Sequence, residues 1–196
     1  MANIRLQTGE VIDDFTVGQR LHIGGMATLW EVIHPDHAIP LVMKAPLLNE
    51  GGDPAAIVSF EMEQMLLPRL SGPHVPKFIA AGDFEARPYI VMERLSGKSL
   101  LARLDELPLP AADVADLGAR IALALEDLHR QHVVHLDVKP SNVMFRADGA
   151  AVLIDYGLSH HTELPDLMEE EFRLPYGTAP YMAPEQVMGN RREPRS

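Results

Sequence analysis

The chain has 196 residues, a formal net charge of −11 at pH 7 and 46% hydrophobic residues. This composition is typical of a soluble globular protein and excludes a fibrous or largely disordered chain. The absence of cysteine excludes disulfides and thiolate metal sites. The negative charge disfavours nucleic acid as a partner, because the field of the molecule repels phosphate. There is no signal peptide and no apolar run near the roughly 18 residues of a membrane span, so we expect no membrane segment and a cytoplasmic location.

The first half of the chain has the pattern of a small β-rich unit with one helix. Strands are expected near residues 16–22, 28–34, 39–45, 77–83 and 88–94. The pair Gly24-Gly25 and the pair Pro35-Asp36 mark the first two bends, which predicts an antiparallel meander. Apolar residues at helical spacing indicate a helix that starts at Pro54 and runs to about Leu70.

The second half begins with a segment rich in turn-forming residues. Residues 95–109 contain glycine, serine and Pro108, and Pro110 follows directly, which fits a hinge and a short helix capped by Ser99. After Pro110, apolar residues recur at steps of three and four and predict a long helix that ends near His132. The residues of this stripe are Val114, Leu117, Ile121, Leu125 and Leu128.

A hairpin is expected after this helix. Two short β-rich stretches, residues 143–145 and 151–154, flank the dipeptide Asp148-Gly149. This dipeptide favours a tight turn in which both central residues have positive φ.

Four motifs carry the most specific information in the sequence. They are Leu41-Val42-Met43-Lys44, His135-Leu136-Asp137-Val138-Lys139-Pro140-Ser141-Asn142, Asp155-Tyr156-Gly157 and Ala183-Pro184-Glu185. In order and spacing they resemble the strand-three lysine motif, the catalytic loop, the Asp-Phe-Gly motif and the Ala-Pro-Glu motif of protein kinases. The resemblance implies an α+β, protein-kinase-like two-lobe fold with a β-rich N-lobe and an incomplete, mainly helical C-lobe.

The resemblance also divides the chain into parts. These are an N-terminal extension (1–14), a kinase N-lobe (15–94), a hinge with a short helix (95–109) and a partial C-lobe (110–196). In the family, several helices follow the Ala-Pro-Glu motif, and none of them is found before Ser196. We therefore expect a truncated form of a bacterial-type serine/threonine protein kinase.

The matched motifs imply a catalytic centre for phosphoryl transfer. Asp137 would orient the substrate hydroxyl and accept its proton, and Lys139 would offset charge on the transferred group. Asn142 and Asp155 would supply oxygen ligands to Mg²⁺. Thr178 lies in a segment that resembles the substrate loop of serine/threonine kinases and is expected to bond to Asp137 and Lys139. The resemblance thus implies protein substrates with Ser/Thr hydroxyls.

An ATP site is implied by the same resemblance. Its residues are Leu21, Gly24, Gly25, Leu29, Val42, Lys44, Glu63, Met92, Glu93, Leu95 and Met144. Lys44 would bind the α- and β-phosphates and be held by a helix glutamate, for which Glu63 is the better match and Glu61 the alternative. Leucine, valine and methionine side chains would enclose adenine, and backbone groups from Glu93 to Leu95 would hydrogen-bond it, with Met92 as gatekeeper.

Two departures from the family pattern keep other functions open. The glycine-rich loop is His22-Ile23-Gly24-Gly25-Met26-Ala27, in which only Gly24 is in register, and by itself it would be an ordinary hairpin turn. Leu136 stands where many regulated kinases have an arginine that pairs with a phosphate on the activation segment. A pseudokinase or nucleotide-binding scaffold is therefore the alternative. A small-molecule phosphotransferase is disfavoured by the peptide-docking segment that begins at Gly177.

Overall fold

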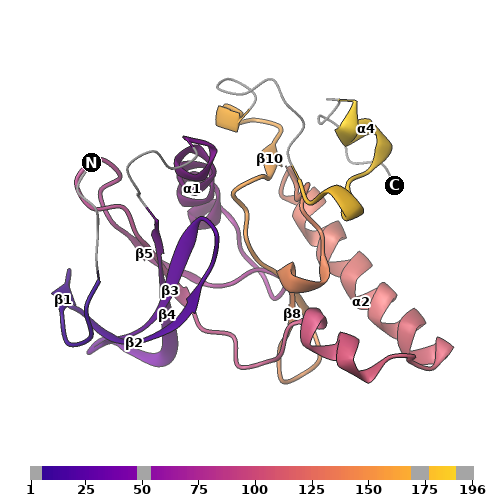
Figure 1. The fold of residues 1–196 in the computed structure, drawn as a ribbon, viewed down its shortest axis with the longest axis horizontal. Helices are drawn as coiled ribbons and strands as arrows, with labels where there is room; N and C mark the ends of the chain where they lie inside the picture. Colours follow the sequence, from indigo (N-terminus) through magenta and orange to yellow (C-terminus); the bar gives the residue numbers. More distant parts are fainter. Residues whose placement is uncertain (1–5, 48–53, 169–176, 189–196) are drawn as a thin grey trace.

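The computed structural model describes residues 6–47, 54–168 and 177–188, which form two lobes (Figure 1). The first lobe contains β1 (Val11–Ile12), β2 (Phe15–Ile23), β3 (Ala27–His34), β4 (His37–Pro46), α1 (Pro54–Leu66), η1 (Leu67–Arg69), β5 (Phe78–Ala81) and β6 (Ile90–Glu93). The second contains η2 (Leu100–Glu106), α2 (Ala111–Arg130), β7 (Val133–Val134), η3 (Pro140–Asn142), β8 (Val143–Phe145), β9 (Ala151–Leu153), β10 (His160–His161), η4 (Ala179–Tyr181) and α4 (Pro184–Val187). A β-rich lobe followed by a mainly helical one confirms the predicted α+β, two-lobe fold.

The first lobe is built on one antiparallel sheet of six strands in the order β1-β2-β3-β4-β6-β5. Strand β4 lies inside the sheet and pairs with β3 and β6. Lys44 on β4 is opposite Leu29 on β3 and Ile90 on β6. The backbone at Lys44 is therefore fixed from both sides.

The sheet begins upstream of residue 15, where the sequence places the start of the N-lobe. Strand β1 pairs with β2, and the side chains of Leu6 and Ile12 are buried with Phe15 in the core of this lobe. Arg87 forms an ion pair with Glu10, which lowers the pKa of that carboxyl. The described part of the predicted N-terminal extension is thus packed as part of the sheet.

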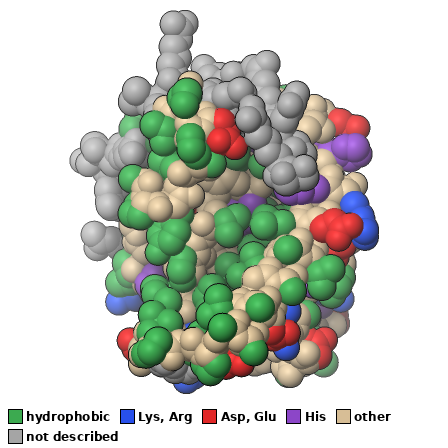
Figure 2. Space-filling model, turned by 90° about the vertical axis from the view of Figure 1, so that its right-hand side faces the viewer, with side chains coloured by type: hydrophobic (Ala, Val, Ile, Leu, Met, Phe, Trp, Pro, Cys, Tyr) green, Lys and Arg blue, Asp and Glu red, His purple; other side chains and the backbone are tan. Residues whose placement is uncertain are grey.

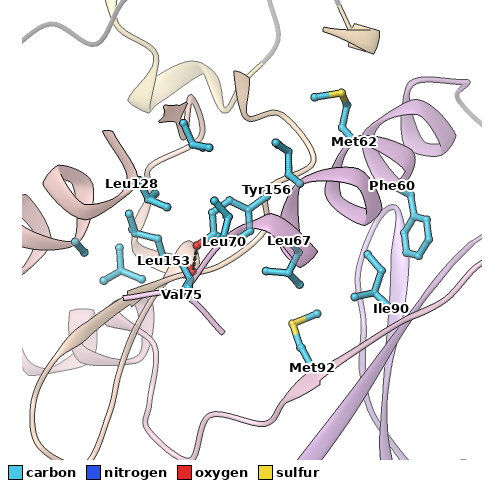
Figure 3. Close-up of a cluster of buried hydrophobic side chains, with 14 of the residues drawn as sticks. Phe60, Met62, Leu67, Leu70, Val75, Ile90, Met92, Leu128, Leu153 and Tyr156 are labelled. Carbon is cyan, nitrogen blue, oxygen red and sulfur yellow. Dashed lines mark hydrogen bonds between the residues drawn. The ribbon is translucent and has the colours of Figure 1, made fainter. Parts of the chain in front are cut away.

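The hydrophobic interior consists of two clusters. One lies within the sheet lobe and is formed by side chains from β1 to β6, among them Phe15, Trp30 and Tyr89. The other joins the lobes, because it combines buried residues of α1, β6, α2 and the β8–β9 hairpin. Tyr156 lies within this second cluster among Leu67, Leu70, Leu128 and Leu153 (Figure 3).

Helix α2 follows the predicted stripe only in part. Leu117 and Leu128 are buried, whereas Val114 is 55% exposed. Leu123, outside the stripe, is also 55% exposed. Figure 2, which views the α2 side of the molecule, shows hydrophobic side chains spread over this face. The helix therefore packs against the hairpin along only part of its apolar surface.

Two local predictions in this lobe are wrong. Ser99 precedes η2 with an extended backbone, but its side chain makes no capping hydrogen bond. In the β8–β9 hairpin, of the two central residues only Gly149 has positive φ, at 86°. The turn is wider than predicted, because the amide of Arg146 bonds to the carbonyl of Ala150 and the amide of Gly149 bonds to the carbonyl of Arg146.

Candidate active site

An ion-pair cluster connects the two lobes, and we call Lys44, Glu63 and Asp155 the lysine cluster. Lys44 on β4 forms an ion pair with Glu63 on α1, and its Nζ lies 2.9 Å from Oδ1 of Asp155. Glu63 is only 2% exposed, and Glu61 makes no ion pair with Lys44 among the described residues. Between the two glutamates that the sequence left open, the structure therefore brings Glu63 to the lysine.

The pKa values of the lysine cluster depend on burial and on the charges that its members exert on one another. Burial by itself lowers the pKa of Lys44, but the charges of Asp155 and Glu63 outweigh this effect and raise that pKa above its ordinary value. The charge of Lys44 holds the pKa of Asp155 below its ordinary value. Burial raises the pKa of Glu63, which the lysine opposes. Lys44 and Asp155 are thus held in their charged forms.

A second cluster surrounds the carboxylate of Asp137, and we call Asp137, Lys139, Asn142 and Thr178 the loop cluster. The Thr178 hydroxyl donates to Oδ1 of Asp137 at 2.8 Å, and the Thr178 amide donates to the same oxygen at 3.2 Å. Oδ2 accepts hydrogen bonds from Lys139 Nζ at 2.7 Å and from Asn142 Nδ2 at 3.0 Å. Lys139 Nζ also donates to the Thr178 hydroxyl at 2.8 Å. Four donors therefore fix the orientation of one buried carboxylate.

The backbone before Asp137 forms a strained turn around Leu136, whose φ is 60°. The Asp137 amide donates to Nδ1 of His135, so the Nε2–H of that imidazole is the group that donates to the Ile154 carbonyl. His135 is 1% exposed, and burial lowers its pKa. A neutral histidine thus links the catalytic loop to the strand that precedes Asp155.

The groups expected to hold Mg²⁺ present oxygen atoms suited to that ion. Asn142 donates from its Nδ2 to Asp137, and its Oδ1, which accepts a hydrogen bond from the Ser141 hydroxyl at 3.3 Å, is the amide oxygen of the site. Oδ1 of Asp155 accepts the hydrogen bond from Lys44, and the Asp155 side chain is 43% exposed. Hard oxygen donors of this kind are what Mg²⁺ prefers, usually with one or two carboxylates and phosphate oxygens. The residues present fit the ion.

Tyr156 and Gly157 fix the segment after Asp155 against the first lobe. The Tyr156 hydroxyl donates to the Leu153 carbonyl at 2.8 Å, and burial raises the tyrosine pKa. A Cβ at Gly157 would lie 2.7 Å from the Ser59 carbonyl oxygen on α1. Only glycine permits this approach, so the segment passes directly against the helix that carries Glu63.

The residues predicted to form the adenine site, including the gatekeeper Met92 and the hinge residue Leu95, come from both lobes. Val42 and Met92 are buried in the cluster that joins the lobes, and Leu21 and Leu29 pack against it half-buried. Met144 lies on β8, where it forms a bridge with Ser99. Leu95 follows β6 and is half-buried.

The glycine-rich loop is the β2–β3 hairpin turn. The Gly24 amide bonds to the Ala27 carbonyl at 2.8 Å, and neither Gly24 nor Gly25 has positive φ. A Cβ on Gly25 would meet no atom within 4 Å, whereas one on Gly24 would lie 3.2 Å from the Ala27 carbonyl. The turn therefore places a tighter limit on residue size at Gly24 than at Gly25.

Two polar residues that the sequence analysis did not single out connect parts of this region. Arg146 forms an ion pair with Glu93 and donates to the carbonyls of Pro73 and Val75. Gln186 on α4 donates to the Leu136 carbonyl. Neither belongs to a motif, and their only sequence signal is a position close to one.

A hollow of about 370 Å³ lies between η2, α2 and the β8–β9 turn. Lys98, Arg120 and Phe145 are among its lining residues. None of the predicted site residues lines it, and the Arg120 guanidinium is engaged by Asp116 and by the Gly149 carbonyl. The hollow is therefore separate from the candidate active site at the two clusters.

Comparisons with known proteins identify the family of the chain. A family model of the protein kinase domain matches residues 15–196. The probable serine/threonine-protein kinase PknB of Lactococcus lactis is 27% identical over 94% of this chain, and the serine/threonine-protein kinase PknL of Mycobacterium bovis is 28% identical over 93%. The chain spans 30% and 45% of the length of these two relatives.

The structural comparison gives the same family. The crystal structure of the Mycobacterium tuberculosis PknI kinase domain aligns with a TM-score of 0.64 and 26% identity, covering 78% of this chain and 63% of the PknI chain. Two lobes with a lysine cluster between them and an Asp-Lys-Asn-Thr cluster beside it define a protein-kinase-like domain. The chain belongs to the protein kinase family. No helix that the described residues form has both the length and the hydropathy to cross a bilayer.

Proposed function

We propose that this chain carries the catalytic apparatus of a serine/threonine protein kinase that transfers the γ-phosphate of Mg·ATP to Ser/Thr hydroxyls of protein substrates. The observation that carries the proposal is the loop cluster, in which Lys139, Asn142 and Thr178 orient one carboxylate, that of Asp137. Phosphoryl transfer depends mainly on alignment and charge neutralisation, and this cluster offers a proton acceptor next to a cation.

Asp137 has the position and the partners of a group that accepts a hydroxyl proton. Its two oxygens already accept four hydrogen bonds, about as many as a carboxylate can accept. A substrate hydroxyl therefore has to replace one donor. Lys139 is the donor that we expect to leave, because its ammonium can bond to phosphoryl oxygens of the nucleotide instead. Its departure would free Oδ2 for the substrate hydroxyl.

The lysine cluster would bind the phosphates of the nucleotide. Lys44 would bind the α- and β-phosphates while Glu63 keeps its ammonium in place. Asp155 and Asn142 would hold Mg²⁺, which when bound neutralises charge on the phosphate oxygens. The pKa of Asp155, lowered by Lys44, keeps this carboxyl in the ionised form that a cation requires. Adenine would lie between Leu21, Leu29 and Val42 on one side and Met144 on the other, with Met92 as gatekeeper. The hinge backbone from Glu93 to Leu95 would hydrogen-bond it.

Specificity for Ser/Thr hydroxyls is supported by Thr178 and by the relatives. Thr178 bonds to both Asp137 and Lys139, the arrangement expected of a serine/threonine substrate loop. The relatives PknB and PknL are named as a probable serine/threonine-protein kinase and a serine/threonine-protein kinase. A nucleotide-binding scaffold would have no chemical need for this complete set of groups. We include the predicted cytoplasmic location, and the exclusion of nucleic acid as a partner, in the proposal.

The test is a transfer assay on the full-length protein. Thermal shift with ATP, with and without Mg²⁺, measures nucleotide binding, and transfer of labelled phosphate to dephosphorylated casein measures catalysis. We expect Mg²⁺-dependent binding and phosphate on serine and threonine. Binding without transfer would support a scaffold. Transfer to small molecules but to no protein would support a small-molecule phosphotransferase.

A further inference from the structure

Gln186 is a buried polar side chain that connects α4 to the catalytic loop. It is 7% exposed. Its Oε1 accepts a hydrogen bond from the Ala183 amide at 3.1 Å, and its Nε2 donates to the Leu136 carbonyl at 2.7 Å. The second bond spans 50 residues of sequence and ends on the residue directly before Asp137. One amide group therefore ties the start of α4 to the turn that presents the carboxylate.

The Leu136 carbonyl belongs to a turn whose geometry decides where Asp137 points. The φ of Leu136 is 60°, a conformation that residues with a Cβ adopt only when their surroundings fix it. Ser159 donates to the carbonyl of His135, and the Asp137 amide donates to Nδ1 of that histidine. Gln186 fixes the carbonyl between these two anchored residues. Loss of its bond would leave the strained peptide free to rotate.

Thr178 and Gln186 attach residues 177–188 to the catalytic loop at two separate points. Thr178 contacts the carboxylate of Asp137, and Gln186 contacts the backbone one residue earlier. One attachment alone would permit rotation about it, whereas two attachments define an orientation. The aliphatic side chain of Leu136 cannot form an ion pair with this segment. The second attachment is therefore the hydrogen bond from the neutral Gln186 amide to the backbone carbonyl of Leu136.

We propose that Gln186 is a positioning residue that holds the backbone at Leu136, and with it the carboxylate of Asp137, in a fixed orientation to the substrate segment 177–188. The inference rests on the proposed kinase function and adds a residue to that site. The hydrogen bonds of Gln186 reach none of the lysine cluster. Its loss should therefore slow transfer to protein hydroxyls and leave nucleotide binding intact.

Gln186→Glu is the sharpest variant, because it keeps the shape of the side chain and the oxygen that bonds to Ala183. It replaces the donor that faces Leu136 with an oxygen. When ionised, this oxygen repels the carbonyl, and when protonated it can donate as the amide did. We expect kcat for a protein substrate to fall roughly tenfold to a hundredfold at about pH 8, because small misplacements of catalytic groups reduce rates by about this factor.

The pH profile separates positioning from simple structural damage. Burial raises the pKa of a carboxyl, so activity of Gln186→Glu should recover as pH is lowered. The readout is the ratio of variant to wild-type kcat at each pH, so that pH effects common to both proteins cancel. The Kd for a Mg·ATP analogue should remain that of the wild type throughout.

Two further variants complete the experiment. Gln186→Met removes both hydrogen bonds at similar length and should give the same fall in kcat with no recovery at low pH. Gln131→Glu is the matched control, because the Gln131 amide also bonds to backbone groups. Its Oε1 accepts from the Ser71 amide at 2.8 Å, and its Nε2 donates to the carbonyls of Ser71 at 3.0 Å and Asp127 at 3.1 Å. It lies outside the site, so its melting temperature should fall while kcat stays unchanged.

The outcomes separate this inference from the proposed function. A wild-type protein that transfers no phosphate would overturn the proposed function itself. An active wild type with Gln186→Glu and Gln186→Met as active as Gln131→Glu would overturn the positioning role alone. Equal losses of kcat and nucleotide affinity, or failure of both Gln186 variants to fold, would show that Gln186 supports the fold in general and would also overturn it.

Discussion

The lysine cluster and the loop cluster both place a cation against a carboxylate, but the chain assembles them over different sequence distances. Lys44 is 19 residues from Glu63 and 111 residues from Asp155. In the loop cluster, Lys139 and Asn142 are two and five residues from Asp137, and only Thr178 comes from farther away. The first cluster therefore exists only when the two lobes meet, whereas most of the second is formed by one loop.

The two clusters also differ in what balances their charges. Glu63 is 2% exposed and depends on Lys44 to offset its burial. Asp137 is buried as well, but its negative charge is stabilised by hydrogen bonds from the Asn142 amide and the Thr178 hydroxyl in addition to the Lys139 ammonium. A change in the lysine cluster should therefore leave a charge uncompensated, while a change in the loop cluster should disturb orientation. The predictions below test this difference.

The largest effect is expected in the lysine cluster. In the full-length protein, Lys44→Met and Asp155→Ala should each reduce single-turnover transfer about a thousandfold, because each removes a group that stabilises charge in the transition state. Lys77→Met, at an exposed lysine of the same lobe, is the control and should keep the wild-type rate. Unchanged single-turnover rates in both cluster variants would contradict the assignment of the nucleotide site.

The loop cluster should respond more mildly and more selectively. Thr178→Ala removes a hydroxyl that bonds to two charged groups, which corresponds to roughly 1.5 to 3 kcal/mol or about a tenfold to hundredfold fall in kcat. Thr178→Ser should restore the rate, and nucleotide affinity should stay constant in both variants. Thr162→Ala, at an exposed threonine, is the control. If serine at position 178 behaves like alanine, orientation by the hydroxyl is not the cause.

Arg146 tests how much its contacts between the two lobes contribute to stability. Arg146→Met removes an ion pair with Glu93 and two bonds to the loop that follows η1, so the free energy of unfolding should fall by about 1 to 3 kcal/mol. Arg130→Met removes the ion pairs of an exposed arginine with Glu126 and Asp127 on α2 and should change the free energy of unfolding by less than about 0.5 kcal/mol. Chemical denaturation measures both. Equal effects would show that the Arg146 contacts contribute no more than a surface pair.

The smallest effect is a pH dependence of stability from the histidine beside the loop cluster. Burial lowers the pKa of His135 below 6.5 in the folded protein. Below about pH 6.5 the unfolded chain therefore binds a proton that the folded protein does not, and stability falls as pH decreases, by at most about 1.4 kcal/mol per pH unit. Above that pH this contribution is constant.

His135→Gln should remove this part of the pH dependence, since glutamine does not titrate. The lowered pKa of His161 gives a change of the same sign, so some slope should remain in the variant. His22→Gln, at an exposed histidine, is the control and should keep the wild-type slope. A variant at position 135 with the full wild-type slope would assign the effect to other groups.

The catalytic loop was predictable from the sequence because its chemistry is local. Asp137, Lys139 and Asn142 lie within six residues of sequence, so the motif that resembles the kinase catalytic loop already contains three of the four residues that meet at this carboxylate. The β-rich lobe was predictable for a similar reason, since its strands alternate with turn residues and pair mostly with their neighbours in sequence. The predictions of the Asp148-Gly149 turn type and of the Ser99 cap were wrong, because at these two places the surrounding chain, and not the local residue preference, determines the backbone conformation.

The sequence by itself determined the two-lobe fold and the residue types of the site, because motif order and hydrophobic period are properties of the chain. The choice of Glu63 over Glu61 required the tertiary structure. Two residues on a helix differ by about 200° in direction, so only the packing of α1 against the sheet decides which carboxylate meets Lys44. The same holds for Arg146 and Gln186. Their partners are backbone carbonyls and a distant glutamate, which carry no sequence signal and meet these side chains only in the folded chain.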